Sequence, residues 1–547
     1  MRIVLVNWAK FADGARAGGG VNGYARDLAL ALVARGHEVA WLSAGLTYVA
    51  DAASELSGAC EVRRLPDDEG VQVYDIVNSP VVAPGIFQFR DPMGEISAPA
   101  LEAELTRFLR VWRPEIVHFH NIEGFSCGCI DAAKVSEPGW PGAAVYFSLH
   151  NYHTLCPQVY LMHKGTTPCI DFDNGHACEG CMAGHDPLVE KRLRAGLDPA
   201  GPPPRPEPSG LGAILPSPLG RMARLARRAV KASIPLPIIE PPMPGRSVRG
   251  HEDAAPATLA APAPSAPVPW SEEHLTQPTW RPLDNRCDPP PASARVMSPY
   301  GTRRQAMVDM LARCDRVLAV SSFVRRKFES MGVPAAVLRE MPIGSRMVER
   351  AARHPWLLPS LRDVRPVVRL GFMGYNNTYK GLPMLLDALD LLVPETLARL
   401  DLSIWAKDIE PDLPRVESFR RRLAGLHVQG GYSHDDVPGM LAGIDAGLVP
   451  SIWWDNGPQT VMEFLACGVP VIGAALGGIV DLVRHDVNGL LFRGNDRFDL
   501  ARTLARVATD PTLLGRLREG IRPPLTMAAH AAAMEAEYRA TIAARTS

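Results

Sequence analysis

Short apolar runs recur along this chain, each bounded by polar or turn residues and separated from the next by a stretch of helical periodicity. In the first half they lie at 3–6, 37–42, 116–119, 145–149 and 317–320, and in the second at 367–372, 402–405, 428–430, 447–449 and 469–473. Runs of this length are typical of buried parallel strands. Two such series predict an α/β fold with two Rossmann-like, doubly wound domains.

A chain of 547 residues is too long for one compact core, which agrees with two domains. We expect the first domain to comprise 1–200 and 301–344, with a hinge at Pro342-Ile343-Gly344. The second domain is expected at 345–525. A final Ala-rich helix, within 526–547, is expected to pack back on the first domain.

A proline-rich segment interrupts the first domain. Residues 201–300 contain 23 of the 51 prolines, so the segment is expected to be a mostly disordered insertion. Within it, five basic residues could share one face of a short helix: Arg221, Arg224, Arg227, Arg228 and Lys231. A peripheral contact with a membrane surface and a solvated helix are both left open by this pattern.

The overall charge is balanced, with 58 basic and 59 acidic residues and a net charge of -1. This balance argues against a nucleic-acid partner. No apolar run reaches the ~20 residues that cross a bilayer, and the first residues lack the features of a secretory signal. A cytoplasmic location is therefore expected, with the ten cysteines reduced.

The segment 447–473 carries the clearest chemical signal. A strand is expected to end at Pro450, a loop to carry Asp455, and a helix to open near Pro458 or Gln459. Unpaired amides at a helix start can hold an anion, and this geometry suits a diphosphate. Glu463, in the first turns of the helix, is spaced to reach a ribose diol.

Two further glycine-rich segments are candidates for the same site. Gly374 lies in a loop after a predicted strand, and Lys380 then opens a helix, where its charge can neutralise a leaving diphosphate. Gly19 and Gly20 lie between the first strand and the first helix, where glycine lets the backbone approach a ligand closely.

Two histidines end predicted strands of the first domain, His120 and His150. The carboxyl ends of parallel strands face the crevice where ligands bind in open α/β sheets. A structural role in the backbone hydrogen bonding remains an alternative for both rings.

The segment around Asp455 and Glu463 resembles the donor site of retaining glycosyltransferases with the GT-B fold, of the family-four type (group 1). The resemblance implies that the first acid contacts the transferred sugar and the second the ribose. Asp455 stands where the family has glutamate, and Tyr375 where it has a phosphate-binding arginine. Arg369, Lys407 or a group on the other domain are candidates to replace that arginine.

The resemblance also implies a full set of site residues. The catalytic set is His150, Asp455 and Lys380, with His120 in support. The donor-binding set is Gly19, Gly20, Gly374, Tyr375, Lys380, Gly457, Pro458, Gln459, Thr460 and Glu463.

The implied activity is retaining transfer of a sugar from a nucleotide-diphosphate-sugar donor to a hydroxyl of a glycan or lipid-linked acceptor. No catalytic metal is required, because Lys380 and the helix amides would stabilise the leaving diphosphate. The first domain would hold the acceptor. Two other readings remain: a non-catalytic subunit or scaffold that binds sugar nucleotides, and a nucleotide-sugar epimerase of the same fold.

A loop rich in cysteine follows His150, with Cys156, Cys169, Cys178 and Cys181. Four thiolates that end in a C-x-x-C pair can close a tetrahedral, structural zinc site. Some members of the resembled family carry a similar loop. The irregular spacing leaves free thiols as an equal alternative.

Overall fold

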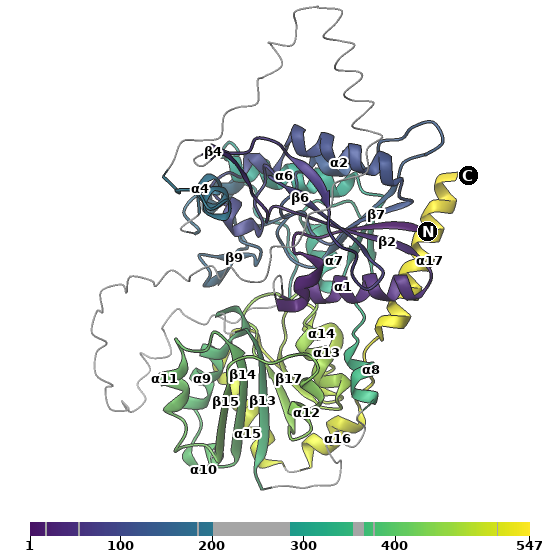
Figure 1. Ribbon diagram of the computed structural model, residues 1–547. Coiled ribbons are helices and arrows are strands. Elements are labelled where there is room, and N and C mark those ends of the chain that lie inside the picture. The colour runs from purple at the N-terminus through teal and green to yellow at the C-terminus, as the bar shows by residue number, and fades with distance from the viewer. Residues whose placement is uncertain are drawn as a thin grey trace, which may run out of the picture.

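The structure is a computed structural model that describes residues 1–16, 19–52, 55–182, 185–200, 285–353, 366–375, 378–510 and 512–546. The proline-rich stretch 201–284, with the predicted basic helix face from Arg221 to Lys231, lies outside the described residues. Two α/β domains lie one above the other in Figure 1.

The first domain contains an eight-stranded sheet in the order β12-β11-β8-β7-β1-β2-β6-β5. Its strands are β1 (Arg2–Val6), β2 (Glu38–Ala44), β5 (Glu61–Arg64), β6 (Gln72–Val77), β7 (Ile116–Phe119), β8 (Ala144–Leu149), β11 (Arg316–Ala319) and β12 (Leu338–Glu340). Neighbouring strands are parallel except for the edge pair β5 and β6. The chain order reverses between β1 and β7, which places a crevice at the carboxyl ends of these two strands.

The second domain contains a six-stranded parallel sheet in the order β15-β14-β13-β16-β17-β18. Its strands are β13 (Val368–Tyr375), β14 (Leu400–Lys407), β15 (Gly425–Gln429), β16 (Ala446–Val449), β17 (Val471–Ala474) and β18 (Gly489–Phe492). This is the strand order of a doubly wound nucleotide-binding domain, with the reversal between β13 and β16. The predicted α/β class with two Rossmann-like domains is confirmed.

Helices connect the strands in both domains. The first domain contains α1 (Gly19–Ala34), α2 (Pro99–Trp112), α3 (Gly128–Ala133), α4 (Pro187–Arg194), α6 (Pro299–Ala312), α7 (Ser322–Ser330), η1 (Phe11–Arg16), η2 (Gly85–Gln88), η3 (Met93–Glu95) and η4 (Asp173–Cys178). The remaining helices are α8 (Met347–Ala352), η8 (Thr378–Lys380), α9 (Leu382–Asp390), α10 (Pro394–Leu397), α11 (Leu413–Glu417), α12 (Val437–Leu441), α13 (Gln459–Ala466), α14 (Ile479–Leu482), α15 (Arg497–Thr509), α16 (Leu513–Glu519) and α17 (Met527–Thr546). Two short hairpins pair β3 (Ala50–Ala52) with β4 (Glu55–Leu56), and β9 (Met162–His163) with β10 (Thr167–Pro168). No helix among the described residues has the length and hydropathy to cross a membrane.

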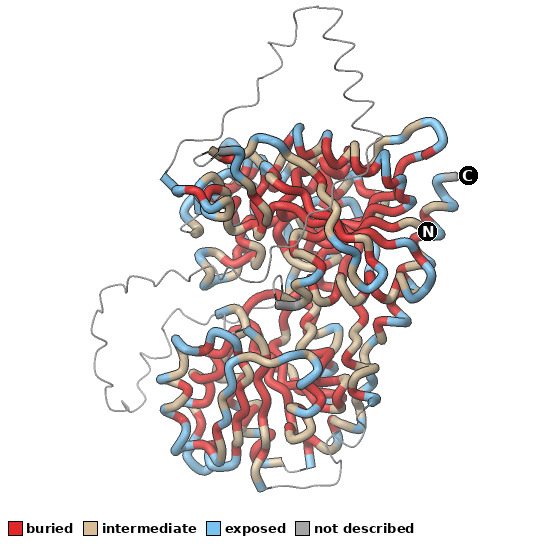
Figure 2. Tube along the Cα trace, in the orientation of Figure 1, coloured by how far each residue is buried: buried red, intermediate tan, exposed pale blue. Residues whose placement is uncertain are grey.

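The buried residues form a core around each sheet (Figure 2). Every residue of β7, β8, β16 and β17 is buried, as expected for central strands that helices cover on both faces.

The chain crosses between the domains at two adjacent places. Ser345 pairs with Thr526 in a parallel bridge, and the Ser345 amide donates to the Leu525 carbonyl at 2.9 Å. The first crossing runs through Gly344 and Ser345, and the second through Leu525 and Thr526. The two are so close that a Cβ added to Gly344 would be 2.6 Å from the Cβ of His530. Only glycine therefore fits at this point of the predicted hinge.

The second crossing continues into α17, which packs against α1 of the first domain (Figure 1) and also contacts β8. Tyr538 of this helix is fully buried, and its hydroxyl lies 2.6 Å from His118 Nδ1. His118 Nε2 in turn lies 2.8 Å from Ser148 Oγ on β8. The C-terminal helix is thus held by buried polar contacts as well as by apolar packing.

We predict that Tyr538→Phe destabilises the protein, because it leaves a buried nitrogen of His118 without this partner. The expected loss is about 1–3 kcal/mol in the free energy of unfolding. Calorimetric thermal unfolding should show a midpoint that falls by about 2–4 °C per kcal/mol. Arg545→Ala, at an exposed position of the same helix, should leave the midpoint unchanged; equal midpoints for both variants would contradict the role of Tyr538.

Candidate functional site

The carboxyl ends of β13 and β16 lie side by side at the reversal of the second sheet, and each leads into a predicted site segment. Lys380 follows β13 in η8, and Asp455 follows β16 in a loop. The turn after Lys380 approaches this loop so closely that a Cβ on Gly381 would be 1.7 Å from the Pro450 carbonyl oxygen. The Lys380-Gly381 sequence therefore brings the lysine against the Asp455 loop.

Lys380 and Asp455 form an ion pair, with 3.0 Å between Nζ and Oδ2. Asp455 is only 5% exposed, and its carbonyl accepts a hydrogen bond from the Gly478 amide at 2.6 Å. Gly477 permits this approach, since a Cβ there would be 2.2 Å from the Asp455 oxygen. The backbone of the second domain thus fixes the carboxylate that meets Lys380.

Glu463 lies in the second turn of α13 and is 4% exposed. Its Oε1 is 3.3 Å from Nε2 of His434, a residue of the loop between β15 and α12. This hydrogen bond to the carboxylate raises the pKa of His434 above its usual value. His434 is not among the residues predicted from the sequence, although its place after a strand of the parallel sheet is a position where ligands bind.

A cavity of about 120 Å³ opens beside Glu463 and His434. It lies between α1, α13, the hinge and α8, and its lining includes Arg26, Asp27, Arg346, Arg350, His434 and Glu463. Several cations therefore surround the predicted ribose-binding acid, and two of them, Arg346 and Arg350, follow the hinge. Nothing in the local sequence of these two arginines indicates that they line a cavity together with Glu463.

The first turn of α13 borders this cavity, because Gln459 belongs to its lining. Pro458 is the N-cap, and no side chain of the described residues caps the helix. Gln459 donates to the Gly20 carbonyl of the first domain at 2.7 Å. A Cβ on Gly20 would be 2.9 Å from the Gln459 side chain, so glycine makes the contact possible.

The remaining donor-binding candidates lie around the same turn. Thr460 is partly exposed beside Gln459, and Gly457 faces Val320 of the first domain, 3.3 Å from the position of an added Cβ. Gly374 has φ +143°, in the region that favours glycine. The structure thus brings these residues together with Gly19 and Gly20 at the domain boundary.

Tyr375 stands where the resembled family has an arginine, and its ring lies 3.9 Å from the Cβ position of Gly19. Lys407, on the adjacent strand, places its Nζ 5.8 Å from the centre of this ring. Arg369 instead forms an ion pair with Asp445 at 3.0 Å. Of the candidates named to replace the arginine, Lys407 therefore lies at the site.

His120 and His150 meet each other, with 3.1 Å between His120 Nδ1 and His150 Nε2. His120 is buried, whereas His150 is partly exposed and contacts the ring of Tyr24 at a centroid distance of 4.9 Å. Burial lowers the pKa of His150 to about 3, so the ring is neutral at physiological pH. It can therefore donate or accept a hydrogen bond but supplies no charge.

Several buried polar atoms of the loop and of α13 have no hydrogen-bond partner among the described residues. They are Ser451 Oγ, Trp453 Nε1, Asn456 Oδ1 and Glu463 Oε2. Buried polar atoms in folded proteins are rarely left without a partner. Their concentration between 451 and 463 is the pattern expected where a polar ligand binds.

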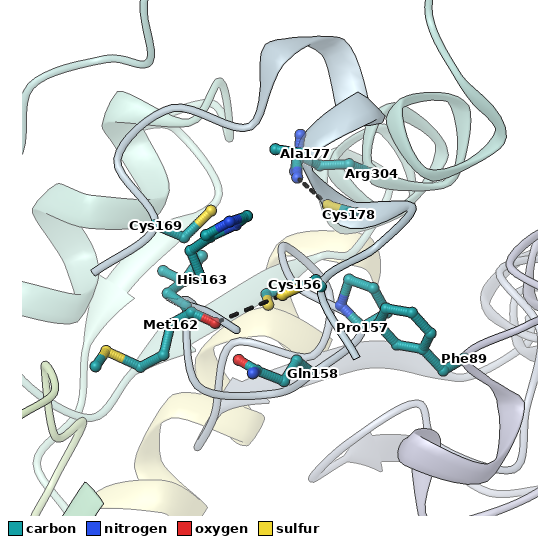
Figure 3. A pocket seen from close by; sticks show the side chains of 12 residues that line it. Phe89, Cys156, Pro157, Gln158, Met162, His163, Cys169, Ala177, Cys178 and Arg304 are labelled. Atoms are coloured by element: carbon teal, nitrogen blue, oxygen red, sulfur yellow. Dashed lines mark hydrogen bonds between the residues drawn. The ribbon is translucent and has the colours of Figure 1, made fainter. Parts of the chain in front are cut away.

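The four cysteines predicted as zinc ligands line one small cavity in the loop that follows β8, shown in Figure 3 with Cys156, Cys169 and Cys178 labelled. In the part of the chain that is described, no three His, Cys, Asp or Glu side chains are arranged to hold a metal ion. The zinc site therefore stays a prediction.

Two family profiles match the chain. The profile described as Glycosyltransferase Family 4 matches residues 18–166, and the one described as Glycosyl transferases group 1 matches residues 367–510. The two matches cover the predicted catalytic and donor-binding residues of both domains, whereas Arg346 and Arg350 lie between the matched ranges.

Curated relatives are similar over shorter segments. The D-inositol 3-phosphate glycosyltransferase of Thermobifida fusca is 33% identical over 166 residues, which cover 30% of this chain and 31% of that protein. The enzyme of the same name from Salinispora arenicola is 40% identical over 88 residues, which cover 16% of this chain and 19% of that protein. The chain thus spans less than a third of the length of these two relatives.

Solved structures share the fold over the whole chain. The sucrose-phosphate synthase of Thermosynechococcus elongatus has a TM-score of 0.53 at 15% identity and covers 100% of both chains. OtsA has a TM-score of 0.51 at 12% identity and covers 98% of this chain and 99% of its own. From the two profiles and this fold, the chain belongs to the group 1, family-four type of glycosyltransferases with the GT-B fold.

Proposed function

We propose that this protein transfers a sugar, with retention of the anomeric configuration, from a nucleotide-diphosphate-sugar to an acceptor hydroxyl. One observation carries the proposal: Lys380, Asp455 and the first turns of α13 with Glu463 lie together at the reversal of the second sheet, facing Gly19 and Gly20. Ligands bind at this place in doubly wound domains.

The donor would bind along the start of α13. Glu463 would accept the ribose hydroxyls, and its unpartnered Oε2 is available for this contact within the described site. The diphosphate would lie against the amides of the first turn and near Lys380, while Lys407 supplies a second cation beside Tyr375. The sugar would lie against Asp455 and His150.

Charge develops on the diphosphate as the glycosidic bond breaks. Lys380 and the helix amides would stabilise that charge in place, so we propose no requirement for a catalytic metal. The leaving phosphate itself would assist attack by the acceptor hydroxyl on the same face. His150, neutral at physiological pH, would orient a sugar hydroxyl and would not act as a charged acid.

We propose a glycan or lipid-linked acceptor bound by the first domain, in a cytoplasmic setting with peripheral membrane contact. All ten cysteines are free thiols, which agrees with a reducing compartment.

Release of nucleoside diphosphate, assayed over a panel of UDP-, GDP- and ADP-sugars, tests the activity. Binding of a donor without turnover would instead support a scaffold, and interconversion of the donor sugar would support an epimerase.

Glu463→Ala should weaken the binding of nucleoside diphosphate, because at least one hydrogen bond to a charged group is lost. The expected cost of about 1.5–3 kcal/mol corresponds to a Kd about 12- to 160-fold higher, measured by isothermal titration calorimetry. Glu417→Ala, which removes an exposed acid of α11 paired with Arg420, should bind normally. Full affinity in the Glu463 variant would refute the placement of the ribose.

Lys380→Met should lower turnover more than donor affinity, because the lysine acts most on the charge that develops in the transition state. Loss of one such group costs about 100- to 1000-fold in kcat. Steady-state kinetics with saturating donor measures the loss of kcat. Because the variant leaves Asp455 without the Lys380 cation, its thermal unfolding should be compared with that of the wild-type protein to confirm that it is folded. A variant with unchanged kcat would exclude Lys380 from catalysis.

The pairing of Glu463 with His434 has its own test by pH titration. Because the pKa of His434 is raised in the fold, the pair stabilises the protein below the ordinary histidine pKa of about 6.5, and this contribution is lost as the pH rises through the raised value. Glu463→Gln should return the pKa of His434 toward its ordinary value, as measured by NMR of labelled histidine. Asp435→Asn, at an exposed acid that instead pairs with Arg350, should change it little.

A further inference from the structure

The first described residue after the proline-rich stretch, Asn285, contacts the second domain directly. Its side-chain amide makes two hydrogen bonds with the backbone of Gly477. Nδ2 donates to the Gly477 carbonyl at 3.1 Å, and Oδ1 accepts from the Gly477 amide at 2.6 Å. An asparagine side chain carries both a donor and an acceptor, so it can pair with both polar groups of one backbone residue. Asn285 thus holds Gly477 from two sides.

The turn that Asn285 holds packs against the backbone of Asp455. Gly477 and Gly478 lie between β17 and α14. A Cβ on Gly477 would be 2.2 Å from the Asp455 carbonyl oxygen and 2.5 Å from its amide nitrogen. The Gly478 amide donates to the same carbonyl at 2.6 Å. The contact is so close that a shift of this turn displaces Asp455.

The chain that follows Asn285 extends the contact to α7. The Cys287 thiol lies 3.9 Å from the carbonyl of Phe323, and the ring of Phe323 stacks on Trp454 at a centroid distance of 6.0 Å. Lys327, also on α7, places its Nζ 4.8 Å from the centre of a Trp454 ring. Trp454 directly precedes Asp455 and is buried. The segment that begins at Asn285 and α7 therefore enclose the loop from the side of the first domain.

A second contact from the first domain holds the far end of the same turn. Ser322, at the start of α7, donates from its amide and its hydroxyl to the two carboxylate oxygens of Asp481, at 2.6 and 2.7 Å. Asp481 belongs to α14, which lies below α7 in Figure 1. The unpaired amides at a helix start favour such a carboxylate. The turn is thus fixed at its end by Ser322 and along its length by Asn285.

The two bonds of Asn285 bear on position more than on stability. Hydrogen bonds between neutral groups contribute little net free energy, since both partners bond to water in the unfolded chain. Their geometry is nevertheless strict, because donor and acceptor have to meet the same backbone residue. Asn285 also lies outside both ranges that the family profiles match, so it belongs to the part of the chain that interrupts the first domain.

We propose that Asn285 is a positioning residue for the transfer of the sugar. Through the turn at 477–478 it sets the place of the Asp455 carboxylate, which lies 3.0 Å from Lys380 Nζ. Asn285 itself would touch neither donor nor acceptor. Because Glu463 and the start of α13 would hold the nucleotide, Asn285 governs the transfer step and not the binding of the nucleotide. This role rests on the proposed function.

Asn285→Ala tests the role by separating turnover from donor affinity. The variant removes both hydrogen bonds and frees the turn, so we expect kcat to fall about 10- to 100-fold, as for a small misplacement of a reacting group. Steady-state kinetics with a donor that the wild-type protein uses measures this loss. The Kd for nucleoside diphosphate, measured by calorimetry, should stay close to the wild-type value.

Two further variants serve as comparisons. Asn285→Asp keeps an acceptor for the Gly477 amide and should recover part of kcat. Arg295→Ala changes an exposed residue of the same segment that pairs with Asp173, and it should behave as the wild-type protein.

Hydrogen exchange gives a second readout that needs no turnover. The amides of Gly477 and Gly478 are both hydrogen-bonded, to Asn285 and to Asp455. In Asn285→Ala these two amides should exchange faster than in the wild-type protein, whereas β1, in the core of the first domain, should exchange at the same rate.

Unchanged kcat in Asn285→Ala, or unchanged exchange at the two glycines, would overturn the proposal. A loss of nucleotide affinity as large as the loss of kcat would also overturn it, because a general loss of structure has that effect. Should Asn285→Ala fail to fold, Asn285→Leu, which keeps the shape and lacks both polar groups, is judged by the same measurements. A wild-type protein that uses no donor would refute the proposed function, and exchange would still show whether Asn285 holds the turn.

Discussion

The loop from β16 into α13 is bound to both domains at once, and the candidate site depends on this attachment. From the first domain, the Tyr152 hydroxyl donates to the Trp454 carbonyl at 2.8 Å. At the start of α13, Gln459 donates to Gly20. The second domain fixes the same loop through Gly477 and Gly478, so Asp455 is positioned from both sides of the boundary.

This arrangement explains why the site needs two domains. The second domain alone supplies Lys380, Asp455 and Glu463, but the cavity beside Glu463 is completed by α1 and by the crossings near Ser345 and Met527. The helix α17 ties the second crossing to the first domain, since its His530 lies 2.6 Å from the Tyr24 hydroxyl on α1. A motion that separates the domains therefore has to act at the two crossings, near Ser345 and Thr526. The backbone there is so tightly packed that position 344 has no space for a side chain.

Much of the fold could be predicted because buried parallel strands are apolar runs. The run 116–119 coincides with β7, and the start of α13 at Gln459 was expected from Pro458. Shorter strands such as β12, with two of its three residues exposed, have no such run and were missed. The helix α1 begins at Gly19 although glycine disfavours helices, and the Gly20 carbonyl in its first turn accepts a hydrogen bond from Gln459 across the domain boundary.

The candidate site was predictable where a local pattern carries it and not where distant segments meet. Lys380, Asp455 and Glu463 belong to short motifs that show their chemistry in the sequence. His434, Arg346 and Arg350 join the site only through the fold, so their neighbours in sequence reveal nothing of their role. The mutual contact of His120 and His150 likewise depends on β7 and β8 being adjacent in the sheet.

Hydrogen exchange of the full chain with and without nucleoside diphosphates tests most directly whether the two domains form one donor site. With UDP, GDP and ADP offered in turn, the account predicts that one of them slows amide exchange at the start of α13 and at the start of α1 over the same range of concentration. Protection confined to one domain, or absent with all three nucleotides, would contradict it.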